Sequence, residues 1–344
     1  MEAHVLLARR AARDFAKRLG FSEKRVADVS LCVTELAQNH LDHNTDNGII
    51  RIFGQRTGEK EAVIVMSSLD MGPGMNPGAI HHKDGLGRGS LGAGLGTVKR
   101  LADSFGLCSG KLGESPCPDL LLGSREFATL VAASFVEPRE KFKEIPMDFS
   151  FLIRPAGESL LCGDGFFFSF DYPFFQMVVM DALGKGRQAA QILAEAKRFL
   201  ALVPSKTHPQ DLLLALGNEM VGTRGIMAQA VRVNVEEPEI LIGAAGDVEH
   251  FLFIDGRERF VSGRRGPIGP VSTRRTVEAI EIAQFSDIMG IFYTDGLGHV
   301  PRVRFNQALM DIPAIIWTNY LFSLCGQEPR HQDDATLVVW KWKA

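Results

Sequence analysis

The spacing of apolar residues predicts two helices at the start of the chain. Segment 1–20 has the periodicity of an amphipathic helix. A second helix is expected to begin near Glu23, because Ser22 is a residue type that caps helix N-termini. Four apolar residues then recur at helical spacing and mark the face expected to be buried: Val26, Val29, Val33 and Leu36. His40 continues the same series.

Strand-like runs and a glycine-rich segment follow these helices. Two runs separated by a turn rich in Thr, Gly and Lys predict strands, IIRIF and AVIVM. A glycine-dense run over 84–96 is expected to open a helix at Thr97, within LGTVKRLADSF, and a closing strand is predicted at FATLVAASF. Helices combined with an antiparallel sheet predict an α+β layer arrangement.

A charged segment with two prolines and no apolar periodicity, VEPREKFKEIPMDFS, divides the chain. It predicts a first domain over 1–136, a linker over 137–147 and a second domain over 148–344. In the second domain, short apolar runs end in aspartates (LLCGD, MVVMD, MGIFYTD), and ATLVVWKW begins after Asp333 and Asp334. Two helix candidates, GRQAAQILAEAKRFLALV and PQDLLLALGNEMV, complete a pattern that predicts two sheets with helices outside.

Composition agrees with two globular domains. The 344 residues are 45% hydrophobic and 23% charged, which excludes a disordered chain. No apolar stretch approaches ~20 residues, so no membrane span is expected, and a net charge of −3 gives no sign of a nucleic-acid binder. The five cysteines are scattered without metal-site spacing, and the N-terminus lacks a signal peptide pattern, so a reduced, cytoplasmic protein is expected.

Two short motifs of the first domain suit nucleotide chemistry. Glu35 and Asn39 are four residues apart, so they share a helix face, where Asn offers an oxygen to Mg²⁺ and Glu accepts a proton. Asp70 follows a strand, and the glycines at Gly72 and Gly74 let a ring approach the backbone beside a carboxylate that accepts from an adenine amine. Taken singly, these residues are more often explained by a solvated helix face and by a simple turn.

The glycine-rich run adds an anion cradle. Successive backbone N–H groups that open a helix bind anions, and Lys83 and Arg88 add positive charge there. A flexible linker is the alternative explanation.

In succession, ELAQNHLDH, DMGPGM and GLGAGLGTVKRLADSF resemble the N, G1 and G2 boxes of the GHKL ATPase superfamily. The resemblance is greatest to the small serine kinases that act as bacterial anti-sigma factors and switch-protein kinases. It implies a GHKL α/β sandwich over 1–136 that binds ATP with Mg²⁺. In that sandwich Asn39 holds Mg²⁺, Asp70 reads adenine and Glu35 is the catalytic base, while three glycines close over the phosphates: Gly92, Gly94 and Gly96. The segment 106–125 is longer than the family's usual ending.

Aspartates at the ends of separate strands of the second domain are able to converge on one edge of a sandwich. Hard divalent cations prefer such oxygen ligands, and a pair of cations clamps a phosphoryl group and activates water. Ordinary turn residues are the alternative, since Asp favours turns.

Six blocks in order resemble the SpoIIE branch of the metal-dependent type 2C serine/threonine phosphatases: CGDGFFF, VVMDALGKGRQAA, ILIGAAGDVEHFLF, GPIGP, IFYTDGLGHV and DDATLVVW. The resemblance implies an αββα sandwich over 148–344 with two Mn²⁺ or Mg²⁺. The implied ligands are the side chains of Asp164, Asp181, Asp295 and Asp333 and the carbonyl of Ala182, with Asp334 in support. Three positions depart from the pattern: Ala182 replaces a frequent Gly, Lys185 a frequent His, and Asp247 the His of Ala-Gly-His. The last departure puts a contact near the substrate in doubt.

Together the two resemblances imply a bacterial signalling regulator. It binds ATP, and it dephosphorylates and also phosphorylates serine on a STAS-type antagonist in a partner-switching pathway, with a sigma factor or another switch protein as a further partner. Two alternatives stay open: an amino-terminal domain that only senses nucleotide or binds a partner, and two domains that sequester a partner. Glu35, Asn39 and the glycines favour chemistry over binding alone.

Overall fold

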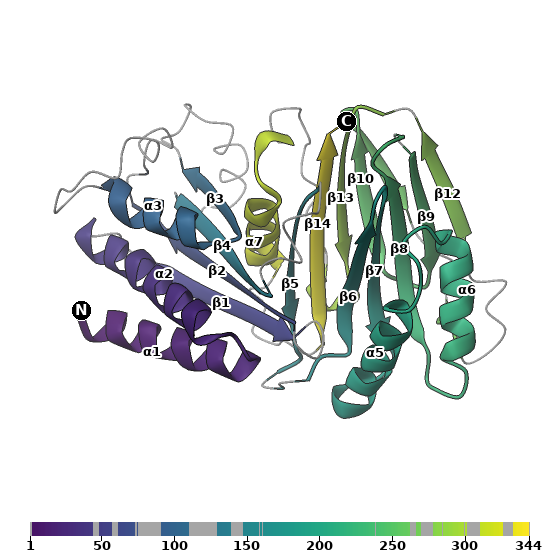
Figure 1. Cartoon of the computed structure of the whole chain (residues 1–344), viewed down its shortest axis with the longest axis horizontal. Helices are drawn as coiled ribbons and strands as arrows, with labels where there is room; N and C mark the ends of the chain where they lie inside the picture. The colour runs from purple at the N-terminus through teal and green to yellow at the C-terminus, as the bar shows by residue number, and fades with distance from the viewer. Residues whose placement is uncertain are drawn as a thin grey trace. The chain divides into compact units, whose positions relative to one another are not determined.

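The structure is a computed structural model (Figure 1). It describes residues 2–43, 48–56, 61–72, 74, 91–109, 129–138, 147–157, 159, 161–237, 239–261, 266–269, 278–283, 285–298, 300, 310–325 and 333–343. The chain forms two compact units: Met1–Glu144 with Asp311–Tyr320, and Ile145–Met310 with Leu321–Ala344. The main division lies inside the segment predicted as a linker, whereas the pattern of the sequence did not indicate that 311–320 groups with the first unit.

The first unit is a helix layer on a four-stranded antiparallel sheet of order β1-β2-β4-β3. Its elements are α1 (Glu2–Leu19), α2 (Glu23–Asp42), β1 (Ile49–Arg56), β2 (Ala62–Asp70), α3 (Leu91–Leu101), β3 (Ser104–Ser109) and β4 (Thr129–Glu137). The apolar stripe of α2 is buried together with alternate residues of β2 and β4, including Ile64, Met66 and Phe135. The sheet side that carries these residues therefore faces the helices.

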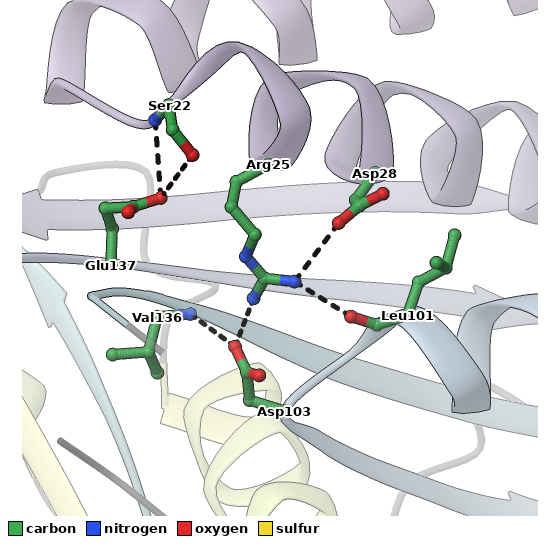
Figure 2. Close-up of polar contacts among 7 residues, drawn as sticks. All are labelled: Ser22, Arg25, Asp28, Leu101, Asp103, Val136 and Glu137. Carbon is green, nitrogen blue, oxygen red and sulfur yellow. Dashed lines mark hydrogen bonds and ion pairs between the residues drawn. The ribbon is translucent and has the colours of Figure 1, made fainter. Parts of the chain in front are cut away.

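Ser22 occupies the N-cap position of α2, as predicted, but its side chain makes no cap. Its hydroxyl and its backbone N–H both donate to Glu137 Oε2, at 3.0 and 3.3 Å. The cap residue thus ties the start of α2 to the end of β4 (Figure 2).

A buried arginine joins three elements next to this tie (Figure 2). Arg25 is only 6% exposed. It donates to the Leu101 carbonyl at 3.0 Å, pairs with Asp28 at 3.3 Å and makes a short ion pair with Asp103. Asp103 also accepts from the Val136 N–H at 2.7 Å. These contacts fix the end of α3 against β4.

The same contacts explain why α3 is shorter than expected at its C-terminus. The pattern LGTVKRLADSF predicted one helix through Phe105, but α3 ends at Leu101 and β3 begins at Ser104. The Asp103 N–H donates to the Ser134 carbonyl at 2.9 Å, so the chain leaves the helix for the sheet at this residue.

The second unit contains two five-stranded antiparallel sheets, β11-β10-β13-β14-β5 and β12-β9-β8-β7-β6. Its elements are β5 (Asp148–Arg154), β6 (Asp164–Asp171), β7 (Phe174–Ala182), α5 (Gly186–Leu200), α6 (Pro209–Glu219), β8 (Ile226–Asn234), β9 (Glu239–Ala245), β10 (Glu249–Ile254), β11 (Arg257–Val261), β12 (Glu278–Ala283), β13 (Asp287–Tyr293), the 3₁₀ turn η4 (Asp295–Leu297) and β14 (Ala335–Lys343). Helix α7 (Ala314–Cys325) is divided between the units.

Aromatic contacts join the two sheets. Phe149 and Phe151 of β5 contact Phe168 and Phe166 of β6, with ring centroids 5.2 and 4.0 Å apart. The opposite side of the β6–β9 sheet packs against α5 and α6. The structure therefore confirms the α+β class and the prediction of two sheets, with the described helices α5 and α6 on the outer side of one of them. One run differs from the expectation: LLCGD was expected to be a strand that ends at Asp164, but strand β6 begins at Asp164.

The structure also bears on two expectations from the sequence, the absence of a membrane span and the reduced state of the cysteines. In the described part of the chain, no helix is both long and apolar enough to cross a membrane. Cys32, Cys162 and Cys325 are not in disulfides, but Cys108 is disulfide-bonded. The expectation of a fully reduced chain is wrong at this residue, because pairing depends on proximity in space, which sequence spacing does not show.

Candidate functional site

Helix α2 and helix α3 bring two of the predicted nucleotide-site residues together. A Cβ atom built on Gly94 of α3 would lie 2.7 Å from Glu35 Oε2 and 3.6 Å from Asn39 Oδ1. Glu35 and Asn39 share a face of α2 and are half-buried. The backbone of α3 at Gly94 therefore lies directly against both side chains, with room for no side chain of its own.

The glycines lie in a helix rather than in a loop. Helix α3 begins at Leu91, not near Thr97, so Gly92, Gly94 and Gly96 belong to its first turns. Glycine disfavours helices, but packing overrides this preference here, because Leu95 and Val98 are fully buried against the core. Gly72 and Gly74 follow β2, and Gly74 has a φ of +76° that glycine adopts readily. Lys83 and Arg88 lie outside the described residues.

Asp70 ends β2 on the side that faces the helices, two positions beyond Ser68 and four beyond the core residue Met66. Its Oδ1 accepts from the Gly72 N–H at 2.9 Å, which fixes the carboxylate toward the following loop. Asp70 pairs in register with Thr129 of β4.

Thr129 and Ser109 are polar residues that the sequence analysis missed. They pair in register on β4 and β3, are buried, and their hydroxyl oxygens are 2.8 Å apart. Asp70, Thr129 and Ser109 therefore form a polar row across three strands at one end of the sheet. The signal available in the sequence was the polar residue at the edge of each apolar strand, but the register that aligns the three arises only on folding.

Two other titratable residues of α2 have shifted pKa values. Burial raises the pKa of the Cys32 thiol to about 12, with a smaller contribution from Asp28, so Cys32 stays a thiol and is not a nucleophile. Burial lowers the pKa of His40, and the charge of Asp70 partly opposes that effect. The imidazole therefore lies within electrostatic reach of Asp70.

In the second unit, Asp164 and Asp181 pair in register on β6 and β7. They continue the strand side that carries Phe166, Phe168 and Phe175, the side that faces the other sheet. Asp164 is 3% exposed. Burial and then the charge of Asp181 raise the pKa of Asp164 well above its usual value. Burial and then the charge of Asp295 raise the pKa of Asp181 to about 6.

Three more aspartates extend this acidic cluster, and one lysine lies at its edge. Asp295 opens η4, directly after β13, and its pKa is raised by burial and by the charges of Asp333 and Asp247. Lys185 Nζ lies 3.3 Å from Asp333 Oδ2 and supplies positive charge at the edge of the cluster. Asp247 was noted in the sequence only as a departure from the phosphatase pattern; the structure adds its charge to the cluster.

Asp334 has a different role from its neighbour. It is buried, its Oδ1 accepts from the Ala156 N–H at 2.7 Å, and its Oδ2 accepts from the Gly163 N–H at 2.6 Å. Both carboxylate oxygens thus anchor the segment that leads into Asp164. Gly163 also lies beside the carbonyl of Ala182, which would be 3.4 Å from a Cβ built on Gly163.

Thr294 is a further residue that the sequence analysis did not single out. It is buried, its hydroxyl hydrogen-bonds Asp164, and this bond lowers the pKa of Asp164 against the larger effect of burial. The Thr336 N–H donates to Thr294 Oγ1 at 2.8 Å, and the Thr294 N–H donates to the Thr336 carbonyl at 3.0 Å. Thr294 therefore holds Asp164 in place from the opposite sheet.

The donor set fits a hard divalent cation. In the part of the chain that the structure describes, no three His, Cys, Asp or Glu side chains are arranged closely enough to hold an ion as they stand. Asp164 Oδ2, however, is buried without a hydrogen-bond partner among the described residues. An unpartnered carboxylate oxygen among mutually repelling aspartates is stabilised by a cation.

Comparisons with known proteins identify the family of the amino-terminal part of the chain. Residues 1–114 match the family described as "Histidine kinase-like ATPase domain". The serine/threonine-protein kinase RsbT of Bacillus subtilis (strain 168) is 35% identical over 109 residues, which are 31% of this chain and 80% of RsbT.

Solved structures resemble this chain at lower sequence identity than RsbT does. The PP2C phosphatase domain of SpoIIE from Bacillus subtilis, with a fragment of its regulatory domain, gives a TM-score of 0.48 at 13% identity, over 99% of this chain and 95% of that one. The RsbU and RsbW domains of a Mycobacterium tuberculosis protein give a TM-score of 0.45 at 20% identity, over 58% of this chain and 61% of that one. These values are too low to assign a function. The match to RsbT covers most of that protein and is close enough to assign a family to the amino-terminal part. Through this part, the chain belongs to the histidine kinase-like ATPase family that includes the serine/threonine-protein kinase RsbT.

Proposed function

We propose that this protein is a partner-switching regulator with two opposed activities: an ATP-dependent serine kinase in the first unit and a metal-dependent serine/threonine phosphatase in the second. The proposed substrate is a serine of a STAS-domain antagonist, and a sigma factor or another switch protein is the proposed further partner. The observation that carries the proposal is the approach of the Gly94 backbone to Glu35 and Asn39, in a domain that belongs to a kinase family. The phosphatase half is supported by the aspartate cluster.

In the first unit, ATP with Mg²⁺ supplies the phosphoryl group when bound. Asn39 offers its amide oxygen to the cation, and Asp70 accepts a hydrogen bond from the adenine amine. Glu35 removes the proton of the partner's serine hydroxyl. The close contact at Gly94 holds the Glu35 carboxylate next to the start of α3. The backbone N–H groups at that helix end would stabilise negative charge on the phosphates. Most of the catalytic effect is then positioning and charge stabilisation.

In the second unit, two Mn²⁺ or Mg²⁺ ions supply an activated water when bound. Asp164, Asp181, Asp295 and Asp333 would hold the ions, together with the carbonyl of Ala182. The chain's other residues keep this set in place, since Thr294 hydrogen-bonds Asp164 and Asp334 anchors the segment before it. Lys185 lies beside Asp333, where its charge favours an incoming phosphate dianion.

The full-length protein, a STAS-domain partner and ATP test the proposal, with and without Mn²⁺. Phosphoserine on the partner is followed by mass spectrometry. Transfer is expected with Mg-ATP, and it should be lost in Glu35→Gln, which keeps the shape of the side chain but not the base. Added Mn²⁺ is expected to remove the phosphate from wild-type reactions but not from Asp181→Asn reactions.

The same reactions separate the alternatives. Hydrolysis of a phosphorylated partner without any transfer would make the first unit a nucleotide-sensing or partner-binding module. Stable binding of the partner with neither transfer nor hydrolysis would indicate sequestration, and would contradict both proposed activities.

A further inference from the structure

The side chain of His40, on α2, contacts strand β2 and the backbone just before β1. Its Nε2 lies 2.7 Å from the hydroxyl oxygen of Ser68 on β2. On the other side of the ring, a Cβ built on Gly48, just before β1, would lie 2.4 Å from His40 Nδ1 and 2.7 Å from Cγ. The imidazole therefore packs directly on the backbone at Gly48 while it hydrogen-bonds Ser68.

This position connects the two ends of the candidate nucleotide site. His40 directly follows Asn39 on α2, and Ser68 lies two residues before Asp70 on the same side of β2. Strand residues two apart point the same way, and the charge of Asp70 acts on the His40 ring. The hydrogen bond between His40 and Ser68 thus joins the residue beside the proposed Mg²⁺ ligand to the strand end that carries the proposed adenine acceptor.

Packing alone does not call for a histidine here. His40 continues the core stripe of α2 after Val33 and Leu36, where a residue such as Leu would fill the same space. Ser68 is only 4% exposed, and a buried hydroxyl without a partner costs about 1–3 kcal/mol. The pair satisfies that hydroxyl, and a hydrogen bond fixes direction and distance in a way that an apolar contact does not.

We propose that His40 is a positioning residue for nucleotide binding: through Ser68 it sets the separation between Asn39 on α2 and Asp70 on β2. The inference rests on the proposed nucleotide site and concerns a residue of the N box to which the resemblance gives no role. A ligand that engages both ends of the site, Mg-ATP, depends on this separation. A ligand that engages only the Asp70 end, adenosine, does not.

Binding of Mg-ATP and of adenosine to the full-length protein is measured by calorimetry. One neutral hydrogen bond changes a dissociation constant by roughly twofold to tenfold. His40→Leu is expected to raise the Kd of Mg-ATP by about that factor and to leave the Kd of adenosine unchanged. His40→Gln, whose amide has a similar reach, is expected to restore most of the Mg-ATP affinity.

Two further variants keep the test specific. Ser68→Ala should weaken Mg-ATP as much as His40→Leu does, and the double variant should be no weaker than either single one, because both remove the same bond. The matched control is Gln38→Ala, which removes an exposed hydrogen bond to Asp42 (2.7 Å) on the same helix and should leave both ligands unaffected.

The outcomes separate this inference from the proposed function. Failure of the wild-type protein to bind Mg-ATP overturns the nucleotide site itself. With wild-type binding intact, an unchanged Mg-ATP affinity in His40→Leu overturns the role of His40. An equal loss for Mg-ATP and adenosine also overturns it, because it marks a general loss of structure rather than a changed separation.

Discussion

The Cα of Gly94 lies so close to Glu35 that a methyl group there would come within 2.7 Å of the Glu35 carboxylate. Real Cβ atoms do not approach an oxygen this closely, so any side chain at residue 94 displaces Glu35 or moves α3. The contact joins the glycine-rich start of α3 to the proposed catalytic base. It makes the glycine a requirement of the site rather than of the helix, since helices favour alanine.

Gly94→Ala is therefore expected to separate stability from activity. Alanine in place of glycine in a helix stabilises by roughly 0.5–1 kcal/mol, so the melting temperature should not fall. Transfer of phosphate to the partner should fall at least tenfold, because the Glu35 carboxylate is moved away from the reacting hydroxyl. Thermal unfolding and a phosphotransfer assay give the two quantities.

Gly96→Ala is the matched comparison for this prediction. It makes the same chemical change one half-turn further along α3, where no described atom lies within 4 Å of the added Cβ. Its effect on transfer should be smaller than that of Gly94→Ala. Equal losses in the two variants would mean that the contact with Glu35 is not the cause.

Asp70→Asn is expected to weaken ATP binding without unfolding the protein. An amide in place of the carboxylate turns part of the acceptor that faces the adenine amine into a donor. A lost hydrogen bond to a charged group costs about 1.5–3 kcal/mol, which is roughly a tenfold to hundredfold rise in Kd. Calorimetric titration with ATP measures the change, and circular dichroism checks the fold. A folded variant with unaltered ATP affinity would remove Asp70 from the site.

Much of the first site was predictable because it depends on local patterns. Helical spacing alone places Glu35 and Asn39 on one face of α2, and the strand pattern places Asp70 at a strand end. Thr129 and Ser109 were not predictable in the same way, because their position beside Asp70 depends on the register of β2, β4 and β3. That register is set by tertiary packing.

The start of α3 and the role of Asp334 were not predictable for a similar reason. Helix propensity argues against a helix through Gly92, Gly94 and Gly96, and burial of neighbouring apolar residues outweighs it. The pair Asp333–Asp334 looks symmetrical in the sequence. In the structure both oxygens of Asp334 accept backbone N–H groups, whereas Asp333 contacts Lys185.

Asp181→Asn is expected to abolish metal-dependent hydrolysis of a phosphoserine protein and to leave ATP binding intact. The amide carries no negative charge, and a hard cation binds it weakly. EDTA should abolish the wild-type activity, and Mn²⁺ should restore it. Asp148→Asn is a control in the same unit, since Asp148 lies at the start of β5 and pairs with Lys341 at 3.0 Å. Hydrolysis that survives EDTA would leave the aspartates without a metal-binding role.

His250 predicts how the stability of the second unit depends on pH. The side chain is fully buried on β10, stacks on Phe292 with a centroid distance of 3.6 Å, and has no hydrogen-bond partner on either ring nitrogen in the described part of the chain. Burial holds its pKa well below the usual 6.5, so the folded protein keeps His250 neutral. The unfolded chain binds a proton at this residue below about pH 6.5. Stability from His250 is therefore present above that pH and falls below it, by up to about 1.4 kcal/mol per pH unit.

His250→Phe removes this contribution and keeps an aromatic ring beside Phe292. Urea unfolding at pH 8 and pH 5 should show a larger loss of unfolding free energy for the wild-type protein than for the variant. A change in packing caused by the larger ring shifts the unfolding free energy by the same amount at both pH values, so it cancels in the difference. His4→Phe is the control, because His4 is exposed on α1 and its replacement should leave the pH dependence as in the wild type. If wild type and His250→Phe lose the same free energy between the two pH values, the buried imidazole does not govern the acid sensitivity of this unit.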